Sequence, residues 1–316
     1  MAGHSEENMN HYWLGAVLAT AISVTGCGAM GGFDQVKEDF HYSYPLESGG
    51  HLRLGNSNGS VQITGWDRNT IDISGTKYAP SAEELRDITI KASVHGSEAS
   101  IQTEMPRRSF HGSYGVAYVI HVPRKTILDR LETSNGSVSL SDLEGGGRIV
   151  SSNGRIAVNH ALGDYQVRTT NGSINLDDCR GAFRAESSNG ALKGNLAAGS
   201  ISASTTNGSV NFTIDNPKNG EPIRASSTNG SVMLAMAAFH DNTIKTDTTN
   251  GSITLRLPRD TNANVNASTS MASIKSDLPI LTSGETSKHH LTGKLGNGGP
   301  LISAETTMGS IRLQRY

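Results

Sequence analysis

The amino-acid sequence predicts an all-β fold, a single-stranded β-solenoid of β-helix type with two strands in each coil of about 18–22 residues. An Asn-Gly step recurs at a fixed interval, alternating apolar and polar residues follow it, and the 316 residues include 36 glycines. Steps of 18 residues, then of 22 and 21, separate the recurring Asn residues: Asn135, Asn153, Asn171, Asn189, Asn207, Asn229 and Asn250. Such a period is typical of solenoids, in which each repeat buries its apolar face only by stacking on its neighbours.

The N-terminus carries a predicted export signal. Trp13 to Thr25 form an apolar run that is too short to cross a membrane comfortably, and the run leads into VTGC, which ends at Cys27. This ending resembles the lipobox of bacterial lipoproteins, and the resemblance implies cleavage before Cys27 and acylation of that residue. We therefore predict a lipoprotein signal peptide over residues 1–26 and a tether over residues 27–40. The segment before the apolar run departs from the usual pattern, because it contains two Glu and no Lys or Arg.

Residues 41–316 form the predicted solenoid domain, which starts with an irregular part. An Asn-Gly step at Asn58 opens a first copy of the repeat, and the pattern then lapses over residues 75–131. A helical turn is predicted after Ser81, because Glu84 three residues later completes a capping box. The segments ASIQTEM and VAYVIHV alternate as strands do. We interpret residues 75–131 as an elaborated part that covers strand edges at the N-terminal end of the solenoid.

Regular coils are predicted over residues 132–276. The third residue after each Asn is aliphatic and the fifth is usually so, as with Ile174 and Leu176 after Asn171. This period of two places both residues on one face of a strand, and stacking turns them into two continuous columns of a core. A second strand follows the Gly that recurs ten residues after the Asn, for example Gly163. Each coil therefore has two strands and two turns.

The recurring Asn residues are predicted to form a structural ladder at one turn. Equivalent residues of successive coils lie above one another, so their side-chain amides can hydrogen-bond along the stack, as in cross-β assemblies. The Ser/Thr pairs that precede the Asn residues are expected to do likewise. The Gly after each Asn is expected to supply the bend, because Gly enters positive φ freely.

Residues 277–316 are predicted to hold an insertion followed by the last coil. DLPILTSGETSKHH interrupts the register, after which MGSIRL repeats the coil pattern with Met in place of Asn. The same replacement occurs in MASIKS, which starts at Met271. The array therefore extends beyond its last Asn-Gly step.

The order of these motifs resembles a known family. GHLRLGNSNGSVQITGWD, then YVIHVPRKTILDRLETSNGSVSL and finally HHLTGKLGNGGPLISAETTMGSIRL are similar to the bacterial putative-adhesin family, a β-strand-repeat domain of unassigned molecular function in envelope proteins. The likeness covers residues 40–316. It implies a β-solenoid at the cell envelope, and no particular binding residues come with it.

Composition and single residues exclude several classes of function. The formal net charge is −2 and no basic run occurs, so nothing in the sequence favours a nucleic-acid partner. The 11 His residues show no zinc-binding spacing, and His289 and His290 are expected to be exposed in a loop. Cys179, the only cysteine besides Cys27, is predicted to be a small buried core residue. We therefore predict no catalytic, cofactor-binding or metal-binding residues and no cofactor.

A pair of carboxylates supports an alternative function. Asp142 and Asp178 share the seventh position after the Asn, two coils apart, which corresponds to about 9.6 Å. That separation would suit the acid and base of an inverting glycoside hydrolase. However, His160 holds this position in the intervening coil and no aromatic platform for a sugar is evident, so solvated turn residues are the favoured interpretation.

The leading hypothesis is a lipid-anchored, non-enzymatic protein of the bacterial cell envelope, whose solenoid supplies a long face for adhesion, scaffolding or protein contact. Its expected partners are the membrane, through the anchor, and an unknown protein or glycan ligand. Gly28 after the Cys favours the outer membrane of a double-membraned bacterium. The alternative is a polysaccharide-active β-helix enzyme. An ice-binding array is a third class, which the mixed and adjacent Ser and Thr residues disfavour.

Overall fold

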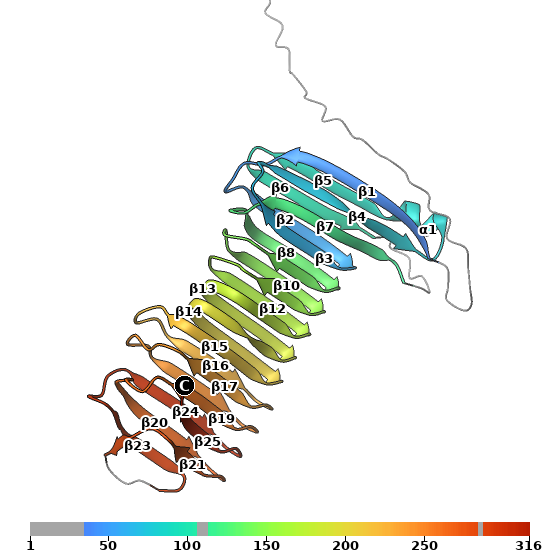
Figure 1. Cartoon of the computed structure of the whole chain (residues 1–316). Helices are drawn as coiled ribbons and strands as arrows, with labels where there is room; N and C mark the ends of the chain where they lie inside the picture. Colours follow the sequence, from blue (N-terminus) through green and yellow to red (C-terminus); the bar gives the residue numbers. More distant parts are fainter. Residues whose placement is uncertain (1–34, 106–112, 284–286) are drawn as a thin grey trace, which may run out of the picture.

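The computed structural model describes residues 35–105, 113–283 and 287–316, which form a rod of stacked coils (Figure 1). The described elements are strands apart from one short helix, α1 (Ala82–Asp87). Each coil contributes one strand to each of two faces, and a continuous apolar core lies between the faces. The predicted all-β solenoid with two strands per coil is confirmed.

Face one is a row of strands whose pairing is antiparallel only at its two ends, between β5 and β6 and among β20, β23 and β22. In order along the rod it contains β5 (Thr89–His95), β6 (Glu98–Glu104), β2 (His51–Asn58), β8 (Ile127–Asn135), β10 (Gly147–Asn153), β12 (Tyr165–Asn171), the second halves of β13 (Ile174–Asn189) and β14 (Leu192–Asn207), β16 (Ile223–Ser227), β18 (Ile244–Thr248), β24 (Leu301–Thr306), β20 (Ala263–Thr269), β23 (His290–Leu295) and β22 (Ile280–Thr282).

Face two is the matching row on the other side of the core. In order along the rod it contains β1 (Val36–Pro45), β4 (Thr70–Ala79), β7 (Gly115–Pro123), β3 (Val61–Trp66), β9 (Val138–Ser141), β11 (Ile156–Asn159), the first halves of β13 and β14, β15 (Val210–Pro217), β17 (Val232–Met236), β19 (Ile253–Leu257), β25 (Ile311–Arg315) and β21 (Ile274–Ser276). β13 and β14 run from face two into face one without a break, so the turn between the faces is itself extended there.

The order of coils in space differs from their order in the chain at both ends of the rod. The β2–β3 coil stacks on β8–β9, and the later β6–β7 coil lies outside it. At the other end, β24–β25 inserts between β18–β19 and β20–β21. The predicted last coil of residues 277–316 is therefore an inner coil, since β22 and β23 pair outside β20 before the chain returns. Antiparallel strands at both ends thus cover edges of parallel strands.

The N-terminal part begins with β1, which starts at Val36, inside the range predicted as a tether. The predicted signal peptide over residues 1–26 and the predicted lipidation site Cys27 lie outside the described residues. The elaborated part contains α1, and its predicted N-cap is confirmed, because the Ser81 hydroxyl accepts a hydrogen bond from the backbone N–H of Glu84 at 3.2 Å.

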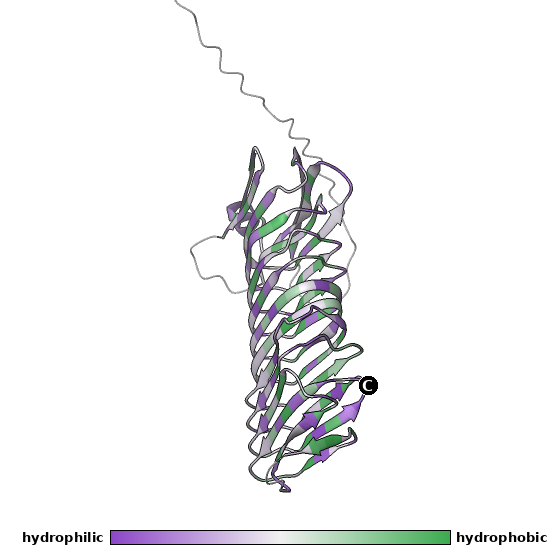
Figure 2. Ribbon diagram, turned by 90° about the vertical axis from the view of Figure 1, so that its left-hand side faces the viewer, coloured by the Kyte–Doolittle hydropathy of each residue, from purple (hydrophilic) through white to green (hydrophobic). Residues whose placement is uncertain are grey.

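Aliphatic columns build the core as the alternation predicted. Ile174 is 0% exposed, and it pairs in register with Ile156 of one neighbouring coil and Leu192 of the other. Along the strands of the rod, hydrophobic residues alternate with hydrophilic ones (Figure 2). Because side chains alternate between the two sides of a strand, one set fills the core and the other forms the outer surface.

The Asn side chains form one continuous column along the rod. Each amide nitrogen donates to the amide oxygen of the preceding Asn in the column at 2.7–2.8 Å, from Asn250 back to Asn58. Asn58 extends the column beyond the regular array, because β2 stacks on β8. Beyond Asn250, the next coils carry the exposed side chains of Met308 and Met271, which cannot continue an amide chain.

Replacing Asn171 with Ala is expected to lower the free energy of unfolding by about 1–2 kcal/mol, because each lost hydrogen bond contributes about 0.5–1.5 kcal/mol. Asn171 makes two ladder bonds, as a donor to Asn153 and as an acceptor from Asn189. Asn250→Ala is the matched control, because this residue ends the described column and makes one ladder bond. Urea denaturation compares the two variants, and equal losses would contradict a cooperative column.

The inner residue of each Ser/Thr pair is buried beside the Asn column. In the coils that follow, its hydroxyl donates to the carbonyl oxygen of a Gly in the preceding coil, for example from Ser187 to Gly172 at 2.9 Å and from Thr205 to Gly190 at 3.0 Å, whereas the buried hydroxyl of Thr133 has no partner among the described residues. The expectation that these inner hydroxyls bond to one another along the stack is therefore wrong. The Gly carbonyl is a turn acceptor close to the core, and such backbone acceptors need a partner when they are shielded from water.

The Gly after each Asn is required for a different reason from the predicted one. In the regular array these Gly residues do not adopt positive φ. A Cβ atom on Gly172 would lie 1.9 Å from the carbonyl oxygen of Gly154, and one on Gly190 would lie 1.9 Å from that of Gly172. Positive φ occurs instead at the opposite turn, with 128° at Gly163 and 129° at Gly181. The Asn-Gly step therefore permits close stacking of coils, and the other Gly column supplies the left-handed bend.

Candidate binding groove

The carboxylates that support the enzyme alternative lie at turns. Asp142, His160 and Asp178 have left-handed backbone conformations, with φ of 59°, 50° and 47°. Asp and His enter this region more readily than most residues. Arg124 Nη1 lies 3.9 Å from the Asp142 carboxylate, and His160 Nε2 lies 3.9 Å from that of Asp178. The left-handed turn explains why Asp and His occupy this position. Their presence is therefore no evidence for a catalytic pair.

Cys179 is a core residue. Its side chain is fully buried, and its thiol donates to the carbonyl oxygen of Val158 at 3.4 Å. Burial raises the pKa of the thiol to about 11. The group is therefore protonated at neutral pH, whereas a nucleophilic cysteine reacts as the thiolate.

The structure places His289 and His290 at the surface. The hydroxyl of Thr292 lies 2.9 Å from the His290 imidazole Nε2. Among the described residues, no three His, Cys, Asp or Glu side chains are grouped so that they could hold a metal ion. That part of the chain also contains no helix with the length and apolar character needed to cross a membrane.

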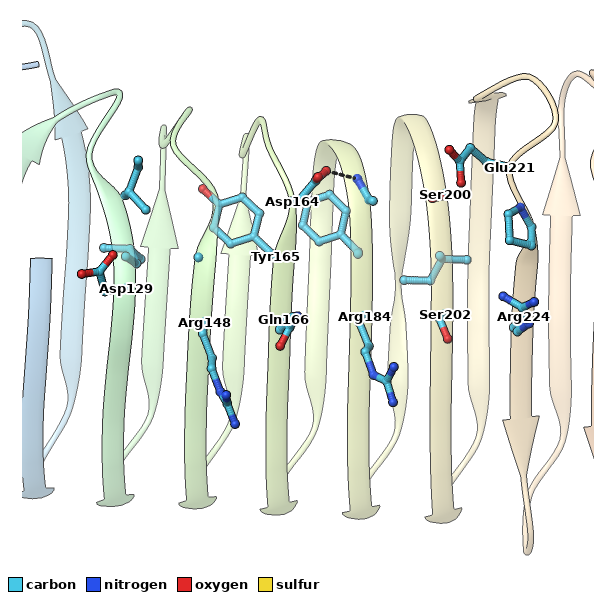
Figure 3. Close-up of a pocket in the computed structure, with 17 residues that line it drawn as sticks. Asp129, Arg148, Asp164, Tyr165, Gln166, Arg184, Ser200, Ser202, Glu221 and Arg224 are labelled. Atoms are coloured by element: carbon cyan, nitrogen blue, oxygen red, sulfur yellow. Dashed lines mark hydrogen bonds between the residues drawn. The ribbon is translucent and has the colours of Figure 1, made fainter. Parts of the chain in front are cut away.

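A groove of about 590 Å³ runs along face one, across β8, β10, β12, β13, β14 and β16 (Figure 3). Two rows of side chains border it. The turn row lies where the chain enters the strands and consists of Asp164, Ala182, Ser200 and Glu221. The strand row lies further along the strands and consists of Arg148, Gln166, Arg184, Ser202 and Arg224.

Parallel register produces the strand row. Arg148 pairs with Gln166, which pairs with Arg184 on the next strand. Arg184 pairs with Ser202, which pairs with Arg224. Neighbouring strands lie about 4.8 Å apart, so a guanidinium recurs about every 9.6 Å and the first and last stand about 19 Å apart along the rod. The row therefore repeats a cation and a neutral polar side chain along the axis of the solenoid.

Two of the three guanidinium groups of the strand row have no ion-pair partner among the described residues. Arg184 Nε donates to the carboxylate of Glu186 at 2.6 Å. Arg148 and Arg224 are exposed, and no described carboxylate lies within ion-pair distance of either. Lys245, the next cation on the same register line, lies 4.0 Å from Asp247. Arg148 and Arg224 are therefore the groups of this line best placed to bind an external anion.

The turn row and the near end of the groove carry carboxylates. Asp164 is exposed, and one of its carboxylate oxygens accepts from the backbone N–H of Ala182 at 3.0 Å (Figure 3). Glu221 lies 3.3 Å from the Lys218 ammonium. Asp129 closes the end at β8, where His51 Nδ1 lies 2.7 Å from its carboxylate. The groove thus presents hydrogen-bond acceptors on one side and cationic donors on the other.

Two residues with stacked aromatic rings, Tyr165 and Phe183, also line the groove. The Tyr165 and Phe183 ring centroids lie 5.4 Å apart with an interplanar angle of 13°. Both side chains are buried, with 1% and 3% of their surface exposed. These rings stabilise the core and leave little face for a ligand to stack on.

The sequence analysis missed the strand row, because its cations never form a run in the chain. Arg148 and Arg184 stand at the thirteenth position after Asn135 and Asn171, two coils apart. Aligning that position over all coils is the signal that could have found them. This alignment does not find Arg224, because the coil that follows Asn207 is longer and Arg224 is not its thirteenth residue.

Comparison with known families identifies the C-terminal part of this fold. Residues 219–314 match the model of the Toastrack family, DUF4097. The chain is similar to this family over that segment. The segment contains β16–β24 and most of β25, and therefore also Arg224 at one end of the groove. The resemblance predicted from the motifs is thereby confirmed for the Toastrack segment, a domain of unknown function.

Solved structures of proteins from three bacteria match this chain. A putative cell adhesion protein from Clostridium sporogenes matches with 15% identity and a TM-score of 0.25, over 88% of this chain and 100% of that one. Putative adhesins from Bacteroides fragilis and Parabacteroides distasonis match with 14% and 9% identity and TM-scores of 0.40 and 0.41, each over 87% of this chain and 96% of theirs. No curated protein matches this chain. The similarity to a known family is therefore given by residues 219–314.

Proposed function

We propose that this protein is a lipid-anchored, non-catalytic binding protein of the bacterial cell envelope, which displays its solenoid for adhesion, scaffolding or protein contact. The observation that carries the proposal is the groove on face one, an open surface bordered by two rows of mostly polar side chains on a long stack of hydrogen-bonded strands. The backbone of such a sheet is already ordered, so binding a ligand does not require the backbone to be ordered. The groove is therefore suited to binding a ligand. Asp142 and Asp178 are not among the residues that line it.

Acylation of Cys27 is the proposed means of attachment, with the outer membrane as the proposed location in a double-membraned bacterium. We expect wild-type protein to incorporate a labelled fatty acid and to sediment with membranes, and Cys27→Ala protein to do neither while keeping its β circular dichroism. Cys179→Ser is the matched control, because that thiol is buried in the core. Wild-type protein found in the soluble fraction would contradict the anchor.

The non-catalytic part of the proposal is tested by incubating the purified protein with a panel of polysaccharides. No new reducing ends are expected, because Asp142 and Asp178 serve as turn residues. Release of reducing ends that disappears in Asp142→Asn or Asp178→Asn protein would establish the β-helix enzyme instead.

A further inference from the structure

We propose that the groove binds a linear acidic polysaccharide, one whose sugar units carry both carboxylate and hydroxyl groups. The inference rests on the proposed function and names the class of ligand for its binding surface. The polysaccharide lies along the rod axis, between the turn row and the strand row, and crosses the strands from β8 to β16.

The strand row is suited to a ligand whose carboxylates are spaced along its length. Arg148 and Arg224 have exposed guanidinium groups without a described ion-pair partner, and a guanidinium binds a carboxylate through two parallel hydrogen bonds. Between the cations stand Gln166 and Ser202, whose side chains both donate and accept hydrogen bonds. A chain with ionised groups separated by neutral polar groups matches this order of side chains.

The turn row fits hydroxyl groups. The carboxylates of Asp164 and Glu221 accept hydrogen bonds and repel anions, so they favour a ligand that presents O–H donors on that side. Sugar hydroxyls are such donors. A polymer that carries only anionic groups would be repelled by these carboxylates and would offer them no hydrogen bonds, which disfavours binding.

Nucleic acid is a poorer fit to the same groove. Its phosphates bring one charge per nucleotide on each strand, and the carboxylates that border the groove oppose such a density. Proteins that bind single strands also stack bases on exposed aromatic rings, whereas Tyr165 and Phe183 are 1% and 3% exposed.

The geometry also predicts a dependence on ligand length. Arg148 and Arg224 stand four strands apart, about 19 Å along the rod. An oligosaccharide too short to reach from one to the other engages one of them, whereas a longer chain engages both and gains from the raised effective concentration at the second site. Affinity is therefore expected to rise with chain length until the oligosaccharide spans this distance, and then to level off.

The test uses the full chain in detergent and isothermal titration with size-fractionated hyaluronate, a linear polysaccharide that carries a carboxylate on every second sugar. We expect binding that weakens as salt rises, no binding of neutral dextran, and a loss of about tenfold or more in affinity for Arg148→Gln/Arg224→Gln protein, since hydrogen bonds to charged groups are stronger than those between neutral groups. Lys245→Gln is the matched control, because Lys245 lies on the same register line, outside the residues of the groove, and has Asp247 beside it. Its affinity is expected to stay within about twofold of wild type.

Four outcomes would overturn the ligand class: no binding of hyaluronate, equal binding of dextran, tighter binding of single-stranded DNA, or an equal loss in the Lys245→Gln control. Thermal melting checks that the variants are folded, which is expected because all three substituted side chains lie on the outer surface. Membrane fractionation of the same proteins separates this inference from the proposed function. If the protein is lipidated and membrane-bound but does not bind acidic polysaccharides, the proposed ligand is wrong and the proposed envelope role is not contradicted.

Discussion

Ile174→Asp protein is expected to lose more than about 4 kcal/mol of its free energy of unfolding, because an unpaired charge in an apolar core is among the most destabilising changes a protein can undergo. Ile174 is 0% exposed, and its neighbours in the column, Ile156 and Leu192, are also 0% exposed. No polar group of the column is present to satisfy the new carboxylate. Urea denaturation followed by circular dichroism measures the loss.

The adjacent residue provides the control for that experiment. Asn175 is the next residue along β13, points to the opposite side of the strand, and is only half-buried. Asn175→Asp adds the same charge to the outer surface and is expected to change the free energy of unfolding by about 0.5 kcal/mol or less. If the two variants unfold at the same urea concentration, this column does not face the core.

Gly190→Val protein is expected to lose about 3 kcal/mol or more, because the new side chain has no room between coils. A Cβ atom at Gly190 would lie 1.9 Å from the carbonyl oxygen of Gly172. That oxygen also accepts the hydroxyl hydrogen bond of Ser187, so moving it disturbs a second contact. Thermal unfolding and urea denaturation measure the effect.

A glycine in open space serves as the comparison for Gly190→Val. A Cβ atom added to Gly220 would meet no heavy atom within 4 Å, and the φ of this residue is 69°, a value that Asn adopts more readily than most residues. Gly220→Asn is expected to cost about 1 kcal/mol or less. If Gly190→Val left the free energy of unfolding unchanged, the coils would not stack as closely at this turn as the structure shows.

Repetition made much of this fold predictable. The Asn period, the alternation after it and the capping box at Ser81 each depend on a few neighbouring residues, and each predicted element is present. The predicted roles of Gly and of the Ser/Thr pairs were wrong for a common reason. Local propensity favours a left-handed bend at Asn-Gly, whereas contacts with the preceding coil decide what the turn of a solenoid requires.

The candidate site was predictable only in part. Asp142 and Asp178 were candidates for a catalytic pair because they share a position in the repeat. The structure shows that this position is a left-handed turn. Arg148 and Arg224 were not predicted as site residues, because residues that lie four strands apart on one face are separated in the chain by several complete coils. Whether a cation is paired also depends on a neighbour such as Glu186, which periodicity does not reveal.

The sequence by itself determined the class of fold, the register of the inner columns and the position of the Asn side chains, because these follow from a pattern that each coil repeats. Only the tertiary structure decided the order of the end coils, the close approach that requires Gly after Asn, and the groove between the two rows of face one. Those features arise where different coils meet. Their causes are contacts between residues far apart in the chain, and a local pattern carries no record of such contacts.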